Sequence, residues 1–198
     1  MRDATTPKRG LLLKPSRHWD GNPDFEHIMN GKSDSDMAKD IDARRSVGGR
    51  STYVNDSPVV RKSNMFECVT LSVTESELVS ATHCAQDMLH AVRILESMGL
   101  KVKKPMLLYV DNKGAKDIAN NWSCGGRTRH TEVRQYFLRE LKEQGIIHTV
   151  WQSGDLNETD LYTKNLGGAK FEQHTSVYVG KDEHMKRDSQ LWEGVRGE

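Results

Sequence analysis

Four acidic residues in this sequence lie at strand ends and helix starts, where enzymes commonly hold their ligands and catalytic groups. Asp111 directly follows the apolar run 106–110, and Asp34 follows an extended segment. Glu77 lies in the first turns of a long helical pattern, and Asp160 begins a later one. Carboxylates at the ends of buried strands are energetically costly unless a cation compensates them. The sequence therefore predicts a cation site built from these four acids.

The chemistry expected of four such carboxylates is metal-assisted hydrolysis of a phosphodiester. Clustered acids raise one another's pKa, and a divalent cation removes that penalty. Ligand sets made only of oxygen favour Mg²⁺ or Mn²⁺. Two such ions, about 3.5–4 Å apart, activate a water molecule and stabilise the leaving oxygen. We therefore predict a site for two ions of Mg²⁺ or Mn²⁺, whose metal-binding and catalytic residues are Asp34, Glu77, Asp111 and Asp160.

Each of these acids also has a purely structural interpretation. Asp34 fits a strand-to-turn position, and we interpret Asp36 and Asp40 nearby as turn and surface acids. Asp111 fits the N-cap of a following helix. Asp160, in a first helical turn, interacts favourably with the helix dipole. A chemical role therefore depends on whether the fold brings the acids together.

Glu77 competes with Glu75 for its place in the predicted site. Ser72 with Glu75, and Thr74 with Glu77, both fit a helix capping box. At about 100° per residue, Glu77 lies about 50° from the centre of the apolar stripe, whereas Glu75 lies about 110° away. Glu77 is therefore expected to border the sheet, and Glu75 is expected to point outward.

The elements that must position these acids follow from hydrophobic periodicity and turn residues. Apolar residues recur every three or four positions over 72–98, which predicts a long amphipathic helix ended by Gly99. The continuous apolar run 106–110 predicts a buried strand. The other expected elements are antiparallel strands over 25–33, 46–55 with a turn at 55–58, and from 59 onward, helices over 114–121, 131–144 and 158–168, and a strand over 146–152.

The predicted order of elements is β-β-β-α-β-α-α-β-α, without an internal repeat. Three meandering strands followed by alternating helices and strands imply an α/β fold, a mixed sheet with helices on its faces. Ligands of such sheets bind at strand ends and in the loops that follow them. The predicted fold therefore offers a common place for the four acids.

Composition limits the class of protein further. The chain has 198 residues, 35% of them hydrophobic, which is enough for one domain with its own core. Its net charge of +1 means that any surface for nucleic acid must be local. The three cysteines form no C-x-x-C pair, which argues against a zinc ribbon. No apolar run approaches the length needed to span a bilayer, so no membrane partner is expected.

The polar ends and the apolar middle predict three regions. Residues 1–23 are expected to form a basic lead-in, 24–180 the folded domain, and 181–198 a charged and flexible tail. The odd number of cysteines without a secretory segment is typical of a reducing compartment. No targeting signal is readable in the sequence.

Five motifs, in order along the chain, resemble the ribonuclease H domain of copia-type LTR retrotransposon polyproteins. They are 31–36 with 44–46, 69–78, 108–115, 126–137 and 160–166. Each motif alone is weakly specific. Five of them in the same order, from Gly31 to Leu166, are strongly specific and cover most of the chain.

The resemblance implies a ribonuclease H-like fold, a five-stranded mixed sheet flanked by helices. It implies hydrolysis of the RNA strand of an RNA–DNA hybrid during reverse transcription, with the same four acids at the site. It also implies a reverse transcriptase domain as partner within the parent polyprotein. Because Met1 falls in what resembles the connecting region, the chain is expected to be a fragment without that domain. The resemblance also implies a location in a cytoplasmic virus-like particle or in the nucleus.

The sequence departs from the family pattern at several points. Met37 replaces the aromatic residue usual after the first acidic pair. Cellular ribonucleases H carry a histidine in the loop before the last acid; 154–157 has none, so His130 or His148 would have to replace it. Two alternatives stay open. One is an inactive remnant that folds and at most binds nucleic acid; the other is an integrase-type nuclease, which would need a glutamate where Ile146 stands.

A phosphate-binding surface requires local positive charge. The residues expected to bind nucleic acid are Arg61, Lys62, Asn112, Arg127, Arg129, His130 and Arg134. Recognition of a hybrid is expected to rest on groove shape and 2′-hydroxyl groups. Arg139 and Lys142 are instead expected on a solvent-exposed helix face. Trp122 and Trp151 are expected in core packing or surface cover rather than in stacking on bases.

Overall fold

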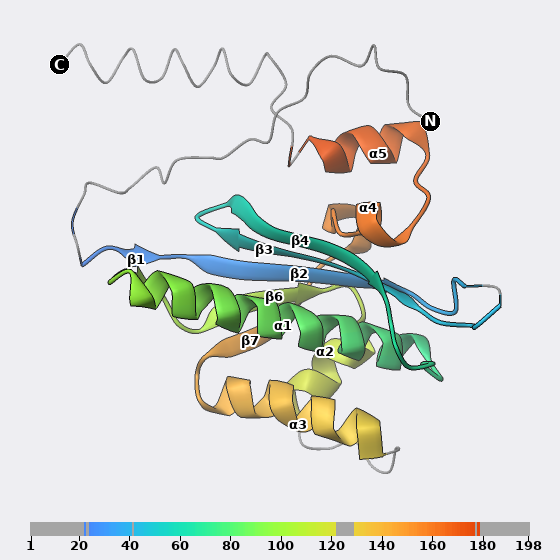
Figure 1. Ribbon diagram of the computed structural model, residues 1–198, viewed down its shortest axis with the longest axis horizontal. Coiled ribbons are helices and arrows are strands. Elements are labelled where there is room, and N and C mark those ends of the chain that lie inside the picture. The colour runs from blue at the N-terminus through green and yellow to red at the C-terminus, as the bar shows by residue number, and fades with distance from the viewer. Residues whose placement is uncertain (1–21, 23, 41, 122–128, 177, 179–198) are drawn as a thin grey trace.

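The structure is a computed structural model that describes residues 22, 24–40, 42–121, 129–176 and 178 (Figure 1). A five-stranded sheet forms its centre, and helices cover both faces of this sheet. Apart from residue 22, the lead-in expected over 1–23 lies outside the described residues, as does the tail expected over 181–198. None of the described helices is both long and apolar enough to cross a membrane.

The central sheet combines antiparallel and parallel strands. Its strands in spatial order are β4 (Ser57–Met65), β3 (Val47–Val54), β2 (Met29–Asp36), β6 (Met106–Val110) and β7 (Ile147–Trp151). β2, β3 and β4 pair antiparallel, whereas β6 pairs in parallel with both β2 and β7. The five-stranded mixed sheet implied by the resemblance to the ribonuclease H family is confirmed. β2 and β6 are neighbours in this sheet. Asp34 lies in β2 and Asp111 directly follows β6, so adjacent strands position the two acids.

A two-residue turn sets the register of the β3–β4 hairpin. Asn55 and Asp56 both have left-handed backbone angles, with φ of 48° and 66°. These angles are typical of a type I′ turn, whose twist matches that of the strands it joins. Asn and Asp tolerate this conformation because their short polar side chains bond locally. The turn predicted at 55–58 is confirmed.

Helix α1 (Val73–Ser97) covers one face of the sheet and lies against β2 and β3. It begins at Ser72, whose side chain accepts a hydrogen bond from the Glu75 backbone N–H at 3.1 Å. Gly99 follows its end with φ of 80°, which glycine adopts without strain. The apolar stripe of α1 and the sheet together form the core, which includes Met29, Leu78, Ala81, Cys84, Ala85, Met88, Val92, Leu108 and Val110.

The remaining helices divide between the two faces of the sheet (Figure 1). α2 (Lys113–Asn120) and α3 (Arg129–Glu143) pack on the same side as α1, beside β7. α4 (Asp160–Thr163) lies on the opposite face, against β2, β3 and β4, with α5 (Gly168–Thr175) next to it. The sheet is therefore enclosed between a three-helix layer and a smaller layer that begins at Asp160.

The first long strand differs from the strand predicted over 25–33. β2 runs on to Asp36, so Asp34 lies inside a strand rather than at its end. The polar end of β2 remains in the sheet because Asp34 and Ser35 pair with Gly49 and Gly48 of β3. The two glycines let the Phe66 ring approach Gly48 and let Thr159 and Thr163 approach Gly49.

The last predicted helix, over 158–168, is wrong as a single element. A 3₁₀ turn (Gly154–Leu156) precedes it, α4 is only one turn long, and α5 is separate. The chain becomes extended at Lys164, with φ of −123° and ψ of 151°, which ends α4. The strand predicted over 25–33 is also interrupted, because its first residues form the separate short strand β1 (Glu26–His27). β1 pairs in parallel with β5 (Lys101–Val102) outside the main sheet, and β5 was not predicted.

Candidate active site

Three of the four predicted acids meet at one end of the sheet. Asp34 of β2, Glu77 of α1 and Asp111, which follows β6, each offer a carboxylate oxygen, and these oxygens lie within 4.8 Å of one another. Three different elements supply them, so the cluster is a product of the tertiary fold. We call Asp34, Glu77 and Asp111 the acid triad.

Glu77 is anchored through one of its oxygens only. The backbone N–H and the hydroxyl of Ser35 donate to Glu77 Oε1 at 2.9 and 2.8 Å. Glu77 is 2% exposed, and its Oε2 is buried without a hydrogen-bond partner among the described residues. Burial, followed by the charges of Asp34 and Asp111, raises the pKa of Glu77 well above its usual value. This oxygen is therefore available to a ligand that the described residues do not provide.

Glu75 has a different role, at the start of the helix. Its Oε2 accepts a hydrogen bond from the Leu71 backbone N–H at 2.8 Å, next to the Ser72 cap. Glu77 faces the sheet, and the orientation predicted from the apolar stripe is confirmed. Glu75 therefore caps the helix, whereas Glu77, two residues later, belongs to the acid triad.

Burial also raises the pKa of the other two members of the triad. The pKa of Asp34, which is 1% exposed, rises from 3.8 to about 6 because burial outweighs the nearby charge of Lys164. The pKa of Asp111 is raised by burial and by the charge of Asp160, against the opposing charge of Lys164. Three acids that resist ionisation in one place are a chemical environment that a divalent cation would stabilise.

Asp160 lies outside the triad and is connected to it through a lysine. The Lys164 ammonium lies 2.7 Å from Asp160 Oδ1 and 3.0 Å from Asp34 Oδ1. The Lys170 ammonium lies 3.0 Å from the other oxygen, Asp160 Oδ2. Burial acts to raise the pKa of Asp160, but the hydrogen bonds and charges of Lys164 and Lys170 outweigh it and lower that pKa. The fourth predicted acid is thus a neighbour of the triad, held by internal cations.

Sequence reasoning missed Lys164, although a signal for it existed. Lys164 follows Asp160 by four residues, the spacing at which oppositely charged side chains meet on a helix. Burial acts to lower the pKa of the Lys164 ammonium, but its hydrogen bonds to Asp160 and Asp34 and the charges of these two acids outweigh burial and raise that pKa. Lys164 therefore acts as an internal counter-ion between Asp34 and Asp160.

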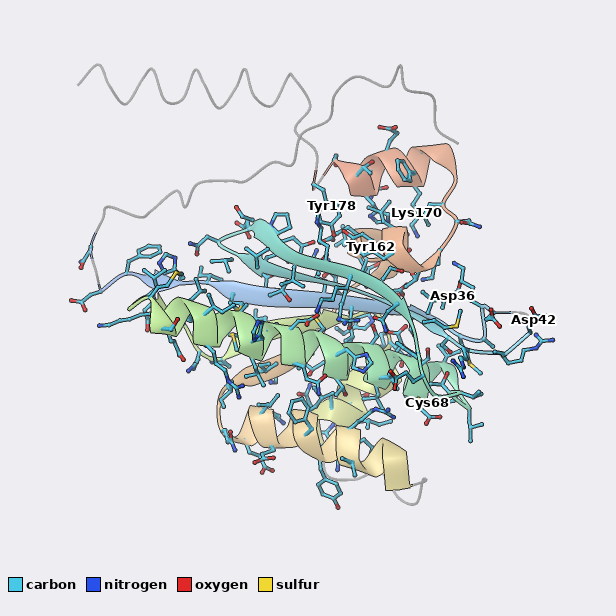
Figure 2. All side chains as sticks on the ribbon, in the orientation of Figure 1. Asp36, Asp42, Cys68, Tyr162, Lys170 and Tyr178 are labelled. Carbon is cyan, nitrogen blue, oxygen red and sulfur yellow. The ribbon has the colours of Figure 1, made fainter. Side chains whose placement is uncertain are left out.

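A buried polar network fixes the chain just before Asp160, and nothing in the sequence pattern indicated it. The Lys32 ammonium lies 2.6 Å from Glu158 Oε2, and the Tyr53 hydroxyl donates to Glu158 Oε1. The hydroxyls of Tyr53 and Tyr178 are 2.8 Å apart. Tyr178 lies with Tyr162 and Lys170 on the α4–α5 side of the sheet (Figure 2). This network attaches Glu158, two residues before Asp160, to Lys32 of β2 and Tyr53 of β3.

The predicted nucleic-acid-binding residues are dispersed. Arg61 lies over the Tyr178 ring, 5.4 Å from its centroid, and Lys62 pairs with Asp87 at 2.7 Å. Asn112 caps α2, where its side chain accepts from the Ala115 N–H at 2.9 Å. The Arg134 guanidinium lies 3.8 Å from Cys68 Sγ. Arg127 lies outside the described residues, as do the side chains of Arg129 and His130.

The prediction of a solvated face for Arg139 and Lys142 is wrong. Arg139 is buried, and its Nε donates to the Ile118 carbonyl oxygen at 3.0 Å. Lys142 is half-buried and donates to the Asn120 carbonyl oxygen. Both side chains bond to carbonyls at the end of α2, so they join α3 to α2 instead of facing solvent.

Of the two histidines proposed to replace the family's loop histidine, only His148 has a described side chain, and it is not near the acids. His148 lies in β7, opposite Leu107, and the side chain of His130 is not among those described. His174 of α5 is nearer the site and is buried, and its Nε2 has no hydrogen-bond partner among the described residues. Burial lowers the pKa of His174, while the charge of Asp160 raises it.

Comparisons with known proteins agree with this geometry. No family model matches the chain. The retrovirus-related Pol polyprotein from transposon TNT 1-94 of Nicotiana tabacum is 33% identical over 145 residues, which is 73% of this chain and 11% of that polyprotein. The retrovirus-related Pol polyprotein from transposon RE1 of Arabidopsis thaliana is 28% identical over 173 residues, which is 87% of this chain and 11% of that polyprotein. The chain thus spans about a tenth of the relatives it matches.

Among solved structures, a ribonuclease H1 named LC11, isolated from compost by a metagenomic approach, superimposes with a TM-score of 0.52. The match covers 69% of this chain and 92% of that chain at 10% identity, and it bears on the fold alone. Sheet order, helix layers and superposition define this chain as a ribonuclease H-like domain. Its sequence relatives place it among the retrovirus-related Pol polyproteins of transposons, and the resemblance to copia-type retrotransposons is confirmed.

The raised pKa values make the stability of the metal-free protein depend on pH. An acid whose pKa is higher in the folded chain than in the unfolded one destabilises the fold as the pH rises from the unfolded pKa through the folded pKa. For Asp34 this interval runs from 3.8 to about 6. For Glu77 it begins at 4.5 and extends well above that value. Without metal, the triad therefore costs stability at neutral pH.

We expect Glu77→Gln to raise the melting temperature of the metal-free protein at about pH 8. The amide oxygen still accepts from Ser35, while the buried charge is removed; a gain of about 1 kcal/mol corresponds to about 2–4 °C. The gain should vanish below pH 4.5, where the wild-type Glu77 carboxyl is protonated in both the folded and the unfolded chain. Thermal unfolding followed by circular dichroism with a chelator measures it, and a variant less stable than the wild type at high pH would contradict the expectation.

Proposed function

We propose that this domain is an endonuclease that hydrolyses the RNA strand of RNA–DNA hybrids with two divalent metal ions. The observation that carries the proposal is the acid triad, three carboxylate oxygens from three elements within 4.8 Å of one another. Glu77 Oε2, which has no hydrogen-bond partner in the described part of the chain, and the raised pKa values of all three acids fit a cation as the missing partner. Oxygen-only ligands select Mg²⁺ or Mn²⁺.

Asp34, Glu77 and Asp111 would hold one ion, and Asp34 with Asp160 would contribute to a second. Such a pair of ions supplies an activated water and stabilises the leaving oxygen of the phosphodiester. The chain's own part is to fix the ligands: Ser35 orients Glu77, and the Glu158 network holds the segment before Asp160. Lys164 occupies the space between Asp34 and Asp160 and would have to move to admit a cation there.

The substrate and partners proposed follow from the relatives. Retrovirus-related Pol polyproteins are the proteins that this chain matches, over about a tenth of their length. We assign to this domain an RNA–DNA hybrid as substrate and the reverse transcriptase domain of a parent polyprotein as partner. Recognition of the hybrid would depend on groove shape and 2′-hydroxyl groups, without sequence selection.

The test is cleavage of end-labelled RNA in three contexts, paired with DNA, single-stranded and paired with RNA, with a labelled DNA duplex as a control. We expect products from the hybrid alone, with Mg²⁺ or Mn²⁺ and not with a chelator. Equal cleavage of single-stranded RNA would contradict the substrate. Tight, salt-sensitive binding of the hybrid without turnover in either metal would contradict the activity and support a non-catalytic nucleic-acid-binding domain.

A further inference from the structure

An exposed tryptophan lies beside the acid triad and takes no part in the proposed chemistry. Trp151 ends β7, the strand next to β6, and its register partner Val110 directly precedes Asp111. It is 43% exposed, although it lies in the sheet. Its indole N–H donates to the Asp111 carbonyl oxygen at 3.0 Å. The ring is therefore held at the site by a polar bond while a large part of its apolar surface remains in solvent.

A cation accompanies this ring. The Lys113 ammonium lies 4.9 Å from the centroid of the Trp151 ring, within the range of a cation–π interaction. Lys113 is exposed at the first residue of α2, two residues after Asp111. Within the described part of the chain, no carboxylate lies within 4.0 Å of its ammonium, whereas Lys116 pairs with Asp117. Lys113 thus keeps a positive charge available next to the acids.

Backbone pairing next to Trp151 holds this residue in place, so its ring has a defined position at the site. The Gln152 N–H donates to the Val110 carbonyl oxygen at 2.8 Å, which extends the β6–β7 pairing past Trp151. Three residues after Trp151, the backbone at Gly154 lies close to Asp111, since a Cβ there would be 3.2 Å from Asp111 Oδ2. A rigid aromatic ring with a polar edge loses little conformational entropy on contact with a ligand, which is why such rings are enriched at binding surfaces.

We propose that Trp151 and Lys113 bind the sugar–phosphate backbone of the strand that is cut at the acid triad. The ring packs against a ribose, and the ammonium contacts a neighbouring phosphate. Inside a duplex the faces of the bases are occupied by stacking, whereas sugars and phosphates are accessible along the wide minor groove of an A-form helix. This inference rests on the proposed function, because it assumes that a nucleic-acid strand reaches the triad.

Equilibrium binding of a labelled hybrid, with Ca²⁺ in place of Mg²⁺ and over a series of salt concentrations, tests the contact. We expect Trp151→Ala to weaken binding about tenfold, because the apolar ring surface that a ribose would cover is lost. Its dependence on salt should stay that of the wild type. Trp151→Phe should retain most of the affinity, because the ring remains. Lys113→Ala should reduce the slope of log K against log salt by about one, as expected for one lost phosphate contact.

Tyr136→Ala is the matched control. Tyr136 is also an exposed aromatic, 53% accessible, with a cation (Arg139) 6.0 Å from its ring centroid, but it lies on α3. We expect its affinity for the hybrid to be unchanged. An equal loss in Tyr136→Ala and Trp151→Ala would overturn the assignment, because the effect would then not depend on proximity to the triad.

Kinetics separate a substrate contact from an effect on Asp111. A contact raises KM and leaves kcat nearly unchanged, whereas loss of the indole bond to the Asp111 carbonyl would lower kcat. If Trp151→Phe lost as much kcat as Trp151→Ala while both bound the hybrid normally, Trp151 would position Asp111 and the inference would fail. If the wild type cut no hybrid, the binding series would still decide, since failure of activity is a failure of the proposed function alone. Wild-type binding by both Trp151 variants and by Lys113→Ala overturns the inference.

Discussion

We expect the hydrolysis of an RNA–DNA hybrid to fall by at least about a hundredfold when Asp111 is replaced by asparagine. The substitution keeps the size of the side chain and removes one of the three charges at the acid triad. A metal ion contributes several kcal/mol of transition-state stabilisation, and each 1.4 kcal/mol corresponds to a factor of ten in rate. Single-turnover cleavage of end-labelled RNA in a hybrid, at saturating Mg²⁺, measures the loss.

The matched control for Asp111→Asn is Asp36→Asn. Asp36 ends the same strand that carries Asp34, but its carboxylate is partly exposed and pairs with Lys39 at 3.2 Å. We expect the Asp36 variant to cleave within about twofold of the wild type, because surface ion pairs contribute little. Full cleavage by Asp111→Asn, in a protein whose wild type is active, would sink the metal-site assignment.

The second large effect is expected at Gly49 of β3, which lies against α4 and the residue before it. A Cβ at this position would lie 2.9 Å from the Thr159 carbonyl oxygen and 2.8 Å from Thr163 Cγ2. Gly49 is also the register partner of Asp34. Gly49→Ala must therefore push the Asp160 turn away from the strand that carries Asp34. We expect a loss of about 1–3 kcal/mol in the free energy of unfolding, typical of overpacking, and at least about a tenfold loss of cleavage.

Chemical denaturation and cleavage assays on the same preparation check both parts of this expectation. Gly168→Ala serves as the control, since nothing lies within 4 Å of a Cβ at Gly168, in the first turn of α5. It should leave both stability and cleavage close to those of the wild type. If Gly49→Ala cleaved as fast as Gly168→Ala, the position of Asp160 relative to β2 would be irrelevant to the reaction.

The elements that could be predicted are those with a strong apolar pattern. The run 106–110 and the stripe over 72–98 became β6 and α1, with bounds close to those expected. The polar end of β2 was not predictable in the same way, since Ser35 and Asp34 stay in the sheet through bonds to α1 and α4. Periodicity detects burial of apolar side chains, and it does not detect polar side chains whose partners are distant in sequence.

The site residues could likewise be predicted where the pattern is local and could not be predicted where their partners are distant in the sequence. Glu77 was separable from Glu75 because both lie on one helix, where the angle between side chains follows from their spacing. Glu158 was not predictable, because its partners Lys32 and Tyr53 are more than a hundred residues away in the chain. Arg139 was misplaced for a related reason: a charged residue on an amphipathic helix is usually solvated, and here the carbonyl of Ile118 gives it a buried partner.

Crystals of the protein soaked in Mn²⁺ show whether the acid triad binds two metal ions. We expect two peaks of anomalous scattering about 3.5–4 Å apart. One peak should contact oxygens of Asp34, Glu77 and Asp111, and the other should contact Asp34 and Asp160, with Lys164 moved aside. Fully occupied Mn²⁺ sites elsewhere on the protein, with none touching the triad, would contradict the account.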